Sequence, residues 1–146
     1  MRDERGQLGG IEGVAFGVLV FVIGTLIVAD AWAAIDAKLA AASAAREAAR
    51  AYVEAPDAET ADARATDAAA RAVAGYGRDP DRMALRHEAV PFERCQRVTF
   101  TVQYRVSLGV IPIIDRPART FVATARHSEL VDPYRSGLPG EAHCVE

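Results

Sequence analysis

Apolar and polar positions divide the chain into segments with different periods. Between Gly13 and Ala29 no residue is charged, and Thr25 carries the one polar side chain. With the small and apolar residues that flank it, this run can form a helix long enough to span about 30 Å of hydrocarbon. Trp32 stands where an aromatic anchor at the membrane interface is expected. We therefore predict a transmembrane helix at residues 11–32.

The charges before this run predict its orientation. The leader, residues 1–10, carries Arg2 and Arg5, and the positive-inside rule keeps such a segment in the cytoplasm. The basic residues after the run are spaced more widely and mixed with acids. We expect a single-pass protein of the cell membrane with an exported, surface-facing C-terminal part.

A cleaved signal peptide is the alternative, because Ala29, Asp30 and Ala31 form a small-x-small cleavage pattern. Three features oppose cleavage there. The apolar run is longer than a usual signal core, Glu12 lies at its front edge, and helix-forming sequence continues through the pattern. These features favour a retained anchor.

The period of 3.6 continues beyond the membrane segment, so residues 33–80 are expected to form two exported helices. The first should continue the transmembrane helix to about Ala55, before Pro56. Its apolar side is predicted to include Ile35, Leu39 and several alanines. Asp57 can cap a second helix. The small face of this second helix should pack on the first as an antiparallel neighbour, through Ala61, Ala65, Ala68 and Ala72.

The period changes to two in residues 81–146, which we expect to form a small β-rich domain with a C-terminal tail. From Val98 to Leu108 apolar and polar residues alternate strictly, as in a half-buried strand. A second strand is predicted at residues 119–128, with Phe121, Ala123 and Ala125 inward, and an edge strand at residues 83–90. The connection at residues 109–118 is broken by two prolines. The predicted fold is α+β: a long helix, a second helix packed on it and a small antiparallel sheet.

The charge balance excludes one class of partner. The formal net charge is −3 and the sequence pI about 5.6, whereas nucleic-acid binding requires a strongly basic face. We therefore expect no nucleic-acid partner.

The two cysteines, Cys95 and Cys144, are predicted to form a disulfide if the domain is exported into an oxidising compartment. The bridge would tie the tail to the start of a strand. A zinc site of Cys95, Cys144, His127 and His143 is the competing interpretation. The sequence contains no nucleophile motif, phosphate-binding loop or metalloprotease motif. We predict no enzymatic activity and no cofactor.

Two features of the membrane helix indicate association with other helices. Gly9, Gly13, Gly17 and Gly24 fall near one helix face, and small residues so placed let another helix approach closely. Glu12 is an ionisable group at the entry to the apolar run. It either reaches the interface or pairs with a cationic group of a neighbouring subunit.

These features together resemble the TadE-like proteins of tight-adherence (Flp-type) pilus systems, which are relatives of type IV pilins and pseudopilins. The resemblance lies in the leader from Arg5 to Glu12 (RGQLGGIE), the alanine-rich segment from Ala44 to Tyr52 (AAREAARAY) and the strand from Val98 to Tyr104 (VTFTVQY). It implies processing between Gly6 and Gln7 by a prepilin peptidase and a charge pair at Glu12. Cleavage there would make Glu12 the sixth residue, whereas the family usually has its glutamate fifth.

The resemblance implies a structural or assembly component of a pilus or a related secretion apparatus. Its partners would be other pilin-like or assembly proteins, bound in an oligomer or a hetero-complex through the transmembrane helix. The alternative is an uncleaved, membrane-anchored module that binds a partner protein and never enters a filament. A membrane-anchored zinc enzyme is a third class, which requires the cysteines and histidines to converge.

Overall fold

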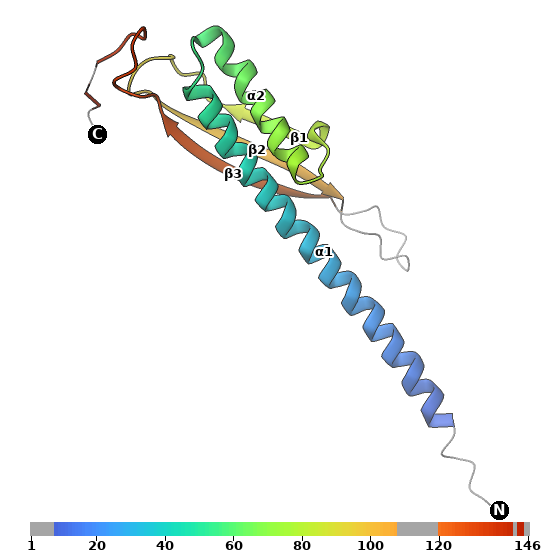
Figure 1. Ribbon diagram of the computed structural model, residues 1–146. Coiled ribbons are helices and arrows are strands. Elements are labelled where there is room, and N and C mark those ends of the chain that lie inside the picture. The colour runs from blue at the N-terminus through green and yellow to red at the C-terminus, as the bar shows by residue number, and fades with distance from the viewer. Residues whose placement is uncertain (1–7, 108–119, 142, 145–146) are drawn as a thin grey trace, which may run out of the picture.

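The computed structural model describes residues 8–107, 120–141 and 143–144. The elements, in chain order, are α1 (Leu8–Val53), α2 (Ala58–Gly75), the short 3-10 helix η2 (Pro80–Arg82), β1 (Met83–His87), β2 (Arg97–Ser107) and β3 (Thr120–Leu130). A long helix projects from a small domain, in which the C-terminal half of α1 and α2 lie against a three-stranded sheet (Figure 1). This arrangement confirms the predicted α+β fold.

Helix α1 is one continuous helix of 46 residues, which at 1.5 Å per residue is about 69 Å long. It ends at Val53, two residues before the predicted end, and Pro56 follows the turn. Its covered side in the domain consists almost wholly of alanine. The buried residues of α1 and the turn after it are Ala37, Ala40, Ala41, Ala44, Ala45, Ala48, Ala49, Tyr52 and Ala55.

The domain covers the predicted apolar side of this helix only in part, because Ala45 and Ala49 are buried whereas Ile35 and Leu39 are not. The relative exposures of Ile35 and Leu39 are 58% and 55%. Alanine side chains let α2 and the sheet approach the α1 backbone closely, so the domain packs on the alanine side of the helix. The larger apolar side chains of Ile35 and Leu39 are left uncovered.

Helix α2 begins as predicted at Asp57, whose Oδ1 accepts a hydrogen bond of 2.9 Å from the Thr60 backbone N–H. Its small face is buried against α1 at Ala61, Ala65 and Ala68, which confirms the predicted packing. After Gly75 the chain turns through Gly77, which has a φ of +68°. This left-handed conformation strains any residue with a Cβ, so glycine suits the turn.

The sheet is antiparallel with the order β1-β2-β3. The alternation predicted for β2 is confirmed, because the side chains on its inner face are buried: Val98, Phe100, Val102, Tyr104 and Val106. On β3 the outcome is mixed. Ala123 is buried and Ala125 packs against the core, but Phe121 keeps 37% of its surface exposed. Phe121 is the second residue of the strand and lies opposite Val106.

The edge strand β1 stops at His87 and does not reach Val90, and Pro91, which cannot donate to a ladder, follows soon after. The predicted connection at residues 109–118 lies outside the described residues.

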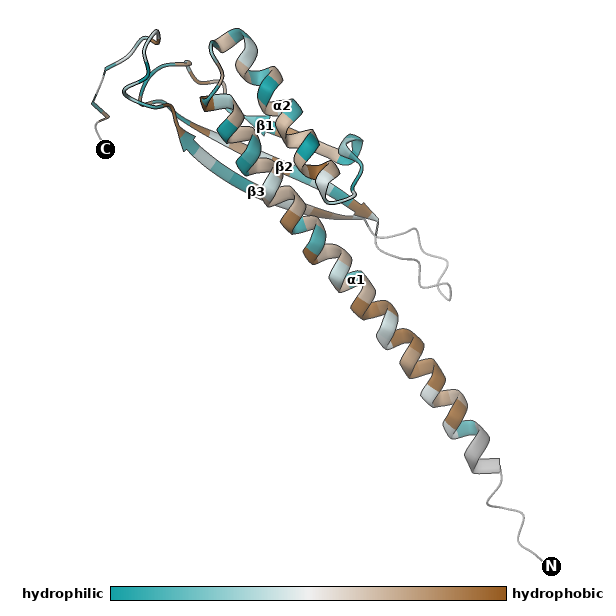
Figure 2. Cartoon of the chain, viewed as in Figure 1, coloured by the Kyte–Doolittle hydropathy of each residue, from teal (hydrophilic) through white to brown (hydrophobic). Residues whose placement is uncertain are grey.

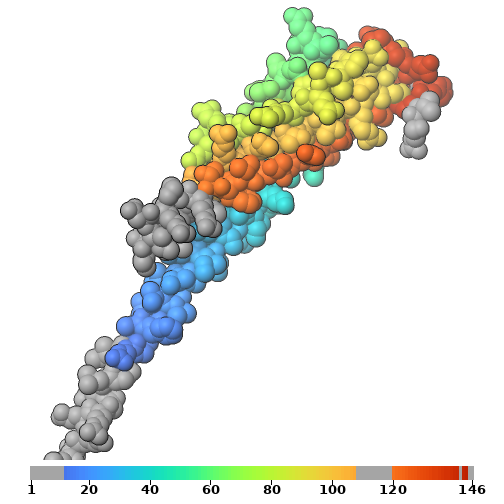
Figure 3. Space-filling view, turned by 180° about the vertical axis from the view of Figure 1, so that it is seen from behind, coloured from blue at the N-terminus to red at the C-terminus, as the bar shows by residue number. Residues whose placement is uncertain are grey.

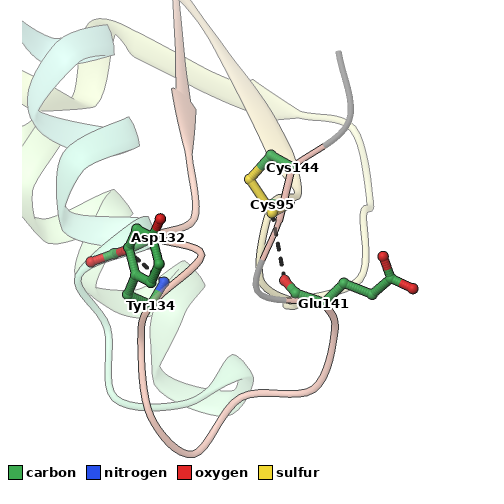
Figure 4. The surroundings of a disulfide bond; sticks show 5 residues. All are labelled: Cys95, Asp132, Tyr134, Glu141 and Cys144. Atoms are coloured by element: carbon green, nitrogen blue, oxygen red, sulfur yellow. Dashed lines mark hydrogen bonds between the residues drawn. A yellow bond between two sulfur atoms is a disulfide. The ribbon is translucent and has the colours of Figure 1, made fainter.

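The C-terminal tail is tied to the turn before β2. The Arg94 backbone N–H donates to the Pro139 carbonyl at 2.9 Å, and the Val131 N–H donates to the Gln96 carbonyl at 2.9 Å. Cys95 and Cys144, which are 49 positions apart, are joined in a disulfide (Figure 4). The bridge agrees with the sequence prediction and closes the tail over the start of β2.

Candidate functional site

The N-terminal half of α1 extends beyond the domain, and its side chains are exposed. Every residue from Glu12 to Ala29 is exposed, and most of this stretch is coloured as hydrophobic in Figure 2. The helix is long and apolar enough to cross a membrane, by length and composition. Thr25 is the one polar side chain between Gly13 and Ala29. Its hydroxyl donates a hydrogen bond of 2.9 Å to the Phe21 carbonyl of the same helix. The segment therefore presents no unsatisfied side-chain polar group to its surroundings between Gly13 and Ala29.

The glycines of this segment have no packing role within the described part of the chain. A Cβ placed on Gly13, Gly17 or Gly24 would meet none of the atoms tested within 4 Å. Glycine in a helix interior destabilises it by about 0.5–1 kcal/mol relative to alanine. Among the described residues, the space beside these three glycines is therefore open.

The glycines share a side of α1 with the exposed apolar residues near the domain. At 100° per residue, Gly13, Gly17, Gly24, Ile35 and Leu39 fall within about 80° of one another around the helix axis. We call these five residues the outward stripe. Where α1 enters the domain, alanines such as Ala37 and Ala40 are buried while Ile35 and Leu39 stay exposed. The domain thus leaves this side of the helix accessible at Ile35 and Leu39.

The other residues singled out from the sequence are placed as follows. Glu12 lies in the second turn of α1 and is exposed. It is about 100° around the axis from Gly13, so its carboxylate is not part of the outward stripe. Gly9 lies in the first turn of α1, whereas Gly6 and Gln7 lie outside the described residues.

Two arginines that the sequence analysis missed connect the domain to α1. Arg78 donates to the Asp36 carboxylate and to the Ala33 carbonyl, both at 2.9 Å, and stacks over the Tyr104 ring. Arg135, from the tail, donates to the backbone carbonyls of Val53 and Ala55. It thereby caps the C-terminal end of α1, where unpaired carbonyls and the helix dipole favour a cation. No sequence pattern distinguishes these two arginines from the other arginines of the chain.

An aromatic cluster joins α1 and the sheet near the distal end of the domain. Tyr52 packs against the rings of His87, Phe92 and Phe100, with centroid distances of 5.4 to 5.5 Å. Burial, followed by the charge of Asp62, raises the pKa of Tyr52 above its ordinary value. His87 Nε2 lies 2.8 Å from Asp62 on α2, and its Nδ1 lies 2.7 Å from the Glu88 carbonyl. The ring therefore links the edge strand to α2 as well as to Tyr52.

The residues proposed for zinc do not converge. The sulfurs of Cys95 and Cys144 are bonded to each other and so cannot act as thiolate ligands. His127 Nε2 lies 2.9 Å from the Glu129 carboxylate on the same strand. Within the described residues, no group of three or more His, Cys, Asp or Glu side chains could hold a metal ion.

Comparisons of the chain with protein-family models, with curated proteins and with solved structures find no significant match.

Proposed function

We propose that this protein is a membrane-anchored structural subunit, a pilin-like component of a pilus or a related secretion apparatus, that assembles through α1. One observation carries the proposal: within the described residues, the outward stripe combines glycines that have open space beside them and apolar side chains left exposed by the domain. Helices in lipid associate through small residues of this kind, because close backbone approach improves van der Waals packing. The stripe offers a parallel neighbour one continuous surface from the membrane into the domain.

The proposal includes a topology, with the leader in the cytoplasm and the domain exported. The two arginines of the leader support this orientation through the positive-inside rule. The disulfide supports it independently, because such bridges persist in oxidising compartments and are rare in the cytosol. The resemblance of the leader, the alanine-rich segment and β2 to TadE-like proteins supports the pilus system in particular.

The proposed packing surface is tested by placing larger side chains on the glycines of the outward stripe. Replacing Gly13 and Gly17 with leucine should weaken association with neighbouring helices by about 1–2 kcal/mol, because the leucines hold the backbones apart. Association is measured by energy transfer between labelled copies, and by co-purification of native partners in mild detergent. Membrane insertion should be unchanged, since leucine is more apolar than glycine.

A matched control uses the opposite side of the same helix. Ala15 and Ala29 are also small and exposed, and they lie about 120–160° from the centre of the outward stripe. Replacing both with leucine should leave association intact. Unchanged association in the glycine variant, or an equal loss in the alanine variant, would refute the packing surface.

The second candidate function is an uncleaved, membrane-anchored binding module. The position of Glu12, sixth after Gly6, favours it over a processed filament subunit. The intact mass of the protein from native membranes separates the two. A processed subunit lacks residues 1–6, and a retained anchor keeps them.

A further inference from the structure

The face of the sheet that points away from the helices has an unusual composition. Because side chains alternate along a strand, the buried positions of β2 and the packed positions of β1 and β3 define the inner face. The remaining fourteen positions of the three strands point outward. Figure 3 views the molecule from this side, with β2 and β3 forming a continuous surface in front of α1.

The outward face carries positive charge and no negative charge. Arg86, Arg97, Arg105 and Arg126 stand on it, all exposed, and none of the fourteen positions holds an acid. None of the four makes an ion pair with any described residue. In a chain whose net charge is −3, this separation of charge gives one face a positive potential that attracts anions.

The arginines are distributed over the whole face. Arg86, Thr101 and Arg126 are register partners across the three strands, so the two arginines are about 10 Å apart at the usual strand spacing. Arg97 and Arg105 are eight residues apart along β2, which is about 27 Å in an extended strand. The array is longer than a small molecule, and it suits an extended chain with repeated negative charges.

Most side chains between the arginines are hydrogen-bonding groups, and the remaining outward positions are the apolar Ala84, Val122 and Leu130. Gln103 stands beside six hydroxyl residues, Thr99, Thr101, Ser107, Thr120, Thr124 and Ser128. The outward positions hold no aromatic residue. Single-stranded nucleic acids bind by stacking on aromatic rings, and protein partners usually supply or receive aromatic anchors. Hydroxyl and amide groups instead both donate to and accept from the many hydroxyls of a carbohydrate.

We propose that this face binds an acidic polysaccharide, whose carboxylate or phosphate groups the four arginines pair with while the hydroxyl and amide side chains contact the sugar hydroxyls. An anionic bilayer surface fits less well, because the strands run beside α1 and the face is therefore roughly parallel to the helix axis (Figure 1). The choice of an extracellular polymer rests on the exported location in the proposed function. The affinity itself is a property of the surface and can be measured without it.

The test uses the full chain in nanodiscs of zwitterionic lipid. Polygalacturonate is the probe and neutral dextran the reference, with binding followed by biolayer interferometry. We expect polygalacturonate to bind, to weaken as salt screens the charges, and to lose about tenfold in affinity in Arg97→Gln/Arg126→Gln. The control Arg46→Gln/Arg64→Gln removes the same charge from exposed helix positions and should bind as the unchanged protein does. Melting temperatures verify that both variants are folded.

Several results would overturn the proposal. They are no binding to polygalacturonate, equal binding to dextran, an equal loss in both double variants, or equal or tighter binding to polyglutamate or duplex DNA of matched charge. The last result would assign the face to acidic proteins or nucleic acid. Specific binding in vitro by a domain that proves to be cytoplasmic would leave the surface assigned and refute the proposed function.

Discussion

Asp57 caps the N-terminus of α2, and the stability that this cap contributes depends on pH. Hydrogen bonds from the backbone and the hydroxyl of Thr60 hold the pKa of its carboxyl below the ordinary value. A depressed pKa in the folded state means that the ionised cap stabilises the fold above the unfolded pKa, about 3.9, and that this contribution is lost as the pH falls through the lower, folded pKa.

Asp57→Ala should therefore lower the melting temperature at neutral pH, by an amount that is constant above about pH 5 and shrinks in stronger acid. Asp57→Asn, which keeps a capping oxygen, should retain most of the stability and lose the pH dependence. Thermal melting of the three proteins between pH 2 and 7 measures both effects. A difference between Asp57→Ala and the unchanged protein that persists in full at pH 2 would contradict the role of the charge.

Some single-residue roles could be predicted from the sequence and others could not. The cap at Asp57 was predictable, because capping depends on local sequence alone. Arg78 and Arg135 were not predictable, because their partners lie 42 and 80 to 82 positions away. The exposure of Ile35 and Leu39 was not predictable either, because hydrophobicity alone does not show which part of the apolar side the domain covers. In this helix the small size of alanine decides which side is covered.

At the scale of elements, α1 combines two environments in one helix. Its N-terminal half is apolar on every side, and its C-terminal half is covered by α2 and the sheet on the alanine side. Arg78 and the cap by Arg135 fix the domain to this second half. A neighbour that packs on the outward stripe would consequently position the two domains as well as the apolar halves of the two helices.

Glu12 lies at the start of the apolar half of α1, and its substitution tests the charge pair implied by the resemblance. Glu12→Gln removes the charge and keeps size and helix propensity. Two unit charges 4 Å apart near a surface attract by about 4 kcal/mol before desolvation. We therefore expect assembly to fall while protein level and export stay unchanged, as measured by cross-linked oligomers in native membranes.

Glu12→Asp provides the comparison, since it keeps the charge on a shorter side chain. It should retain part of the assembly that Glu12→Gln loses. Normal assembly of Glu12→Gln, together with a native mass that still includes residues 1–6, would make Glu12 an interfacial acid of an uncleaved anchor.

At the scale of the whole molecule, the disulfide reports the compartment of the domain. Mass spectrometry of protein from native membranes, without reduction, should show the peptides of Cys95 and Cys144 joined and lighter by two hydrogens. Free thiols that react with a membrane-impermeant reagent in intact cells would refute the bridge but keep the exported location. Free thiols that react only after lysis would refute both.

The order and type of the elements could be predicted, because strong local patterns specify each of them. The change of period from 3.6 to 2 separates the helices from the strands, and Pro56 and Gly77 mark the breaks. The arrangement of the sheet faces followed from alternation on β2, yet the shared register of Arg86, Thr101 and Arg126 depends on long-range pairing. The basic face was therefore not visible in the sequence, where Arg86 and Arg126 are 40 positions apart.

The central claim is that the outward stripe of α1 faces a neighbouring helix in the membrane. A photo-reactive benzoylphenylalanine at Val28 would lie beside the stripe, and one at Val22 would lie about 120° away from Val28. Both valines are exposed in the monomer, at 67% and 47%, so either could react with lipid. After irradiation of native membranes, we predict a cross-linked protein product from Val28 that is much weaker from Val22 and lost on adding Gly13→Leu/Gly17→Leu. Equal products from both positions, or a Val28 product that survives the leucines, would contradict the account.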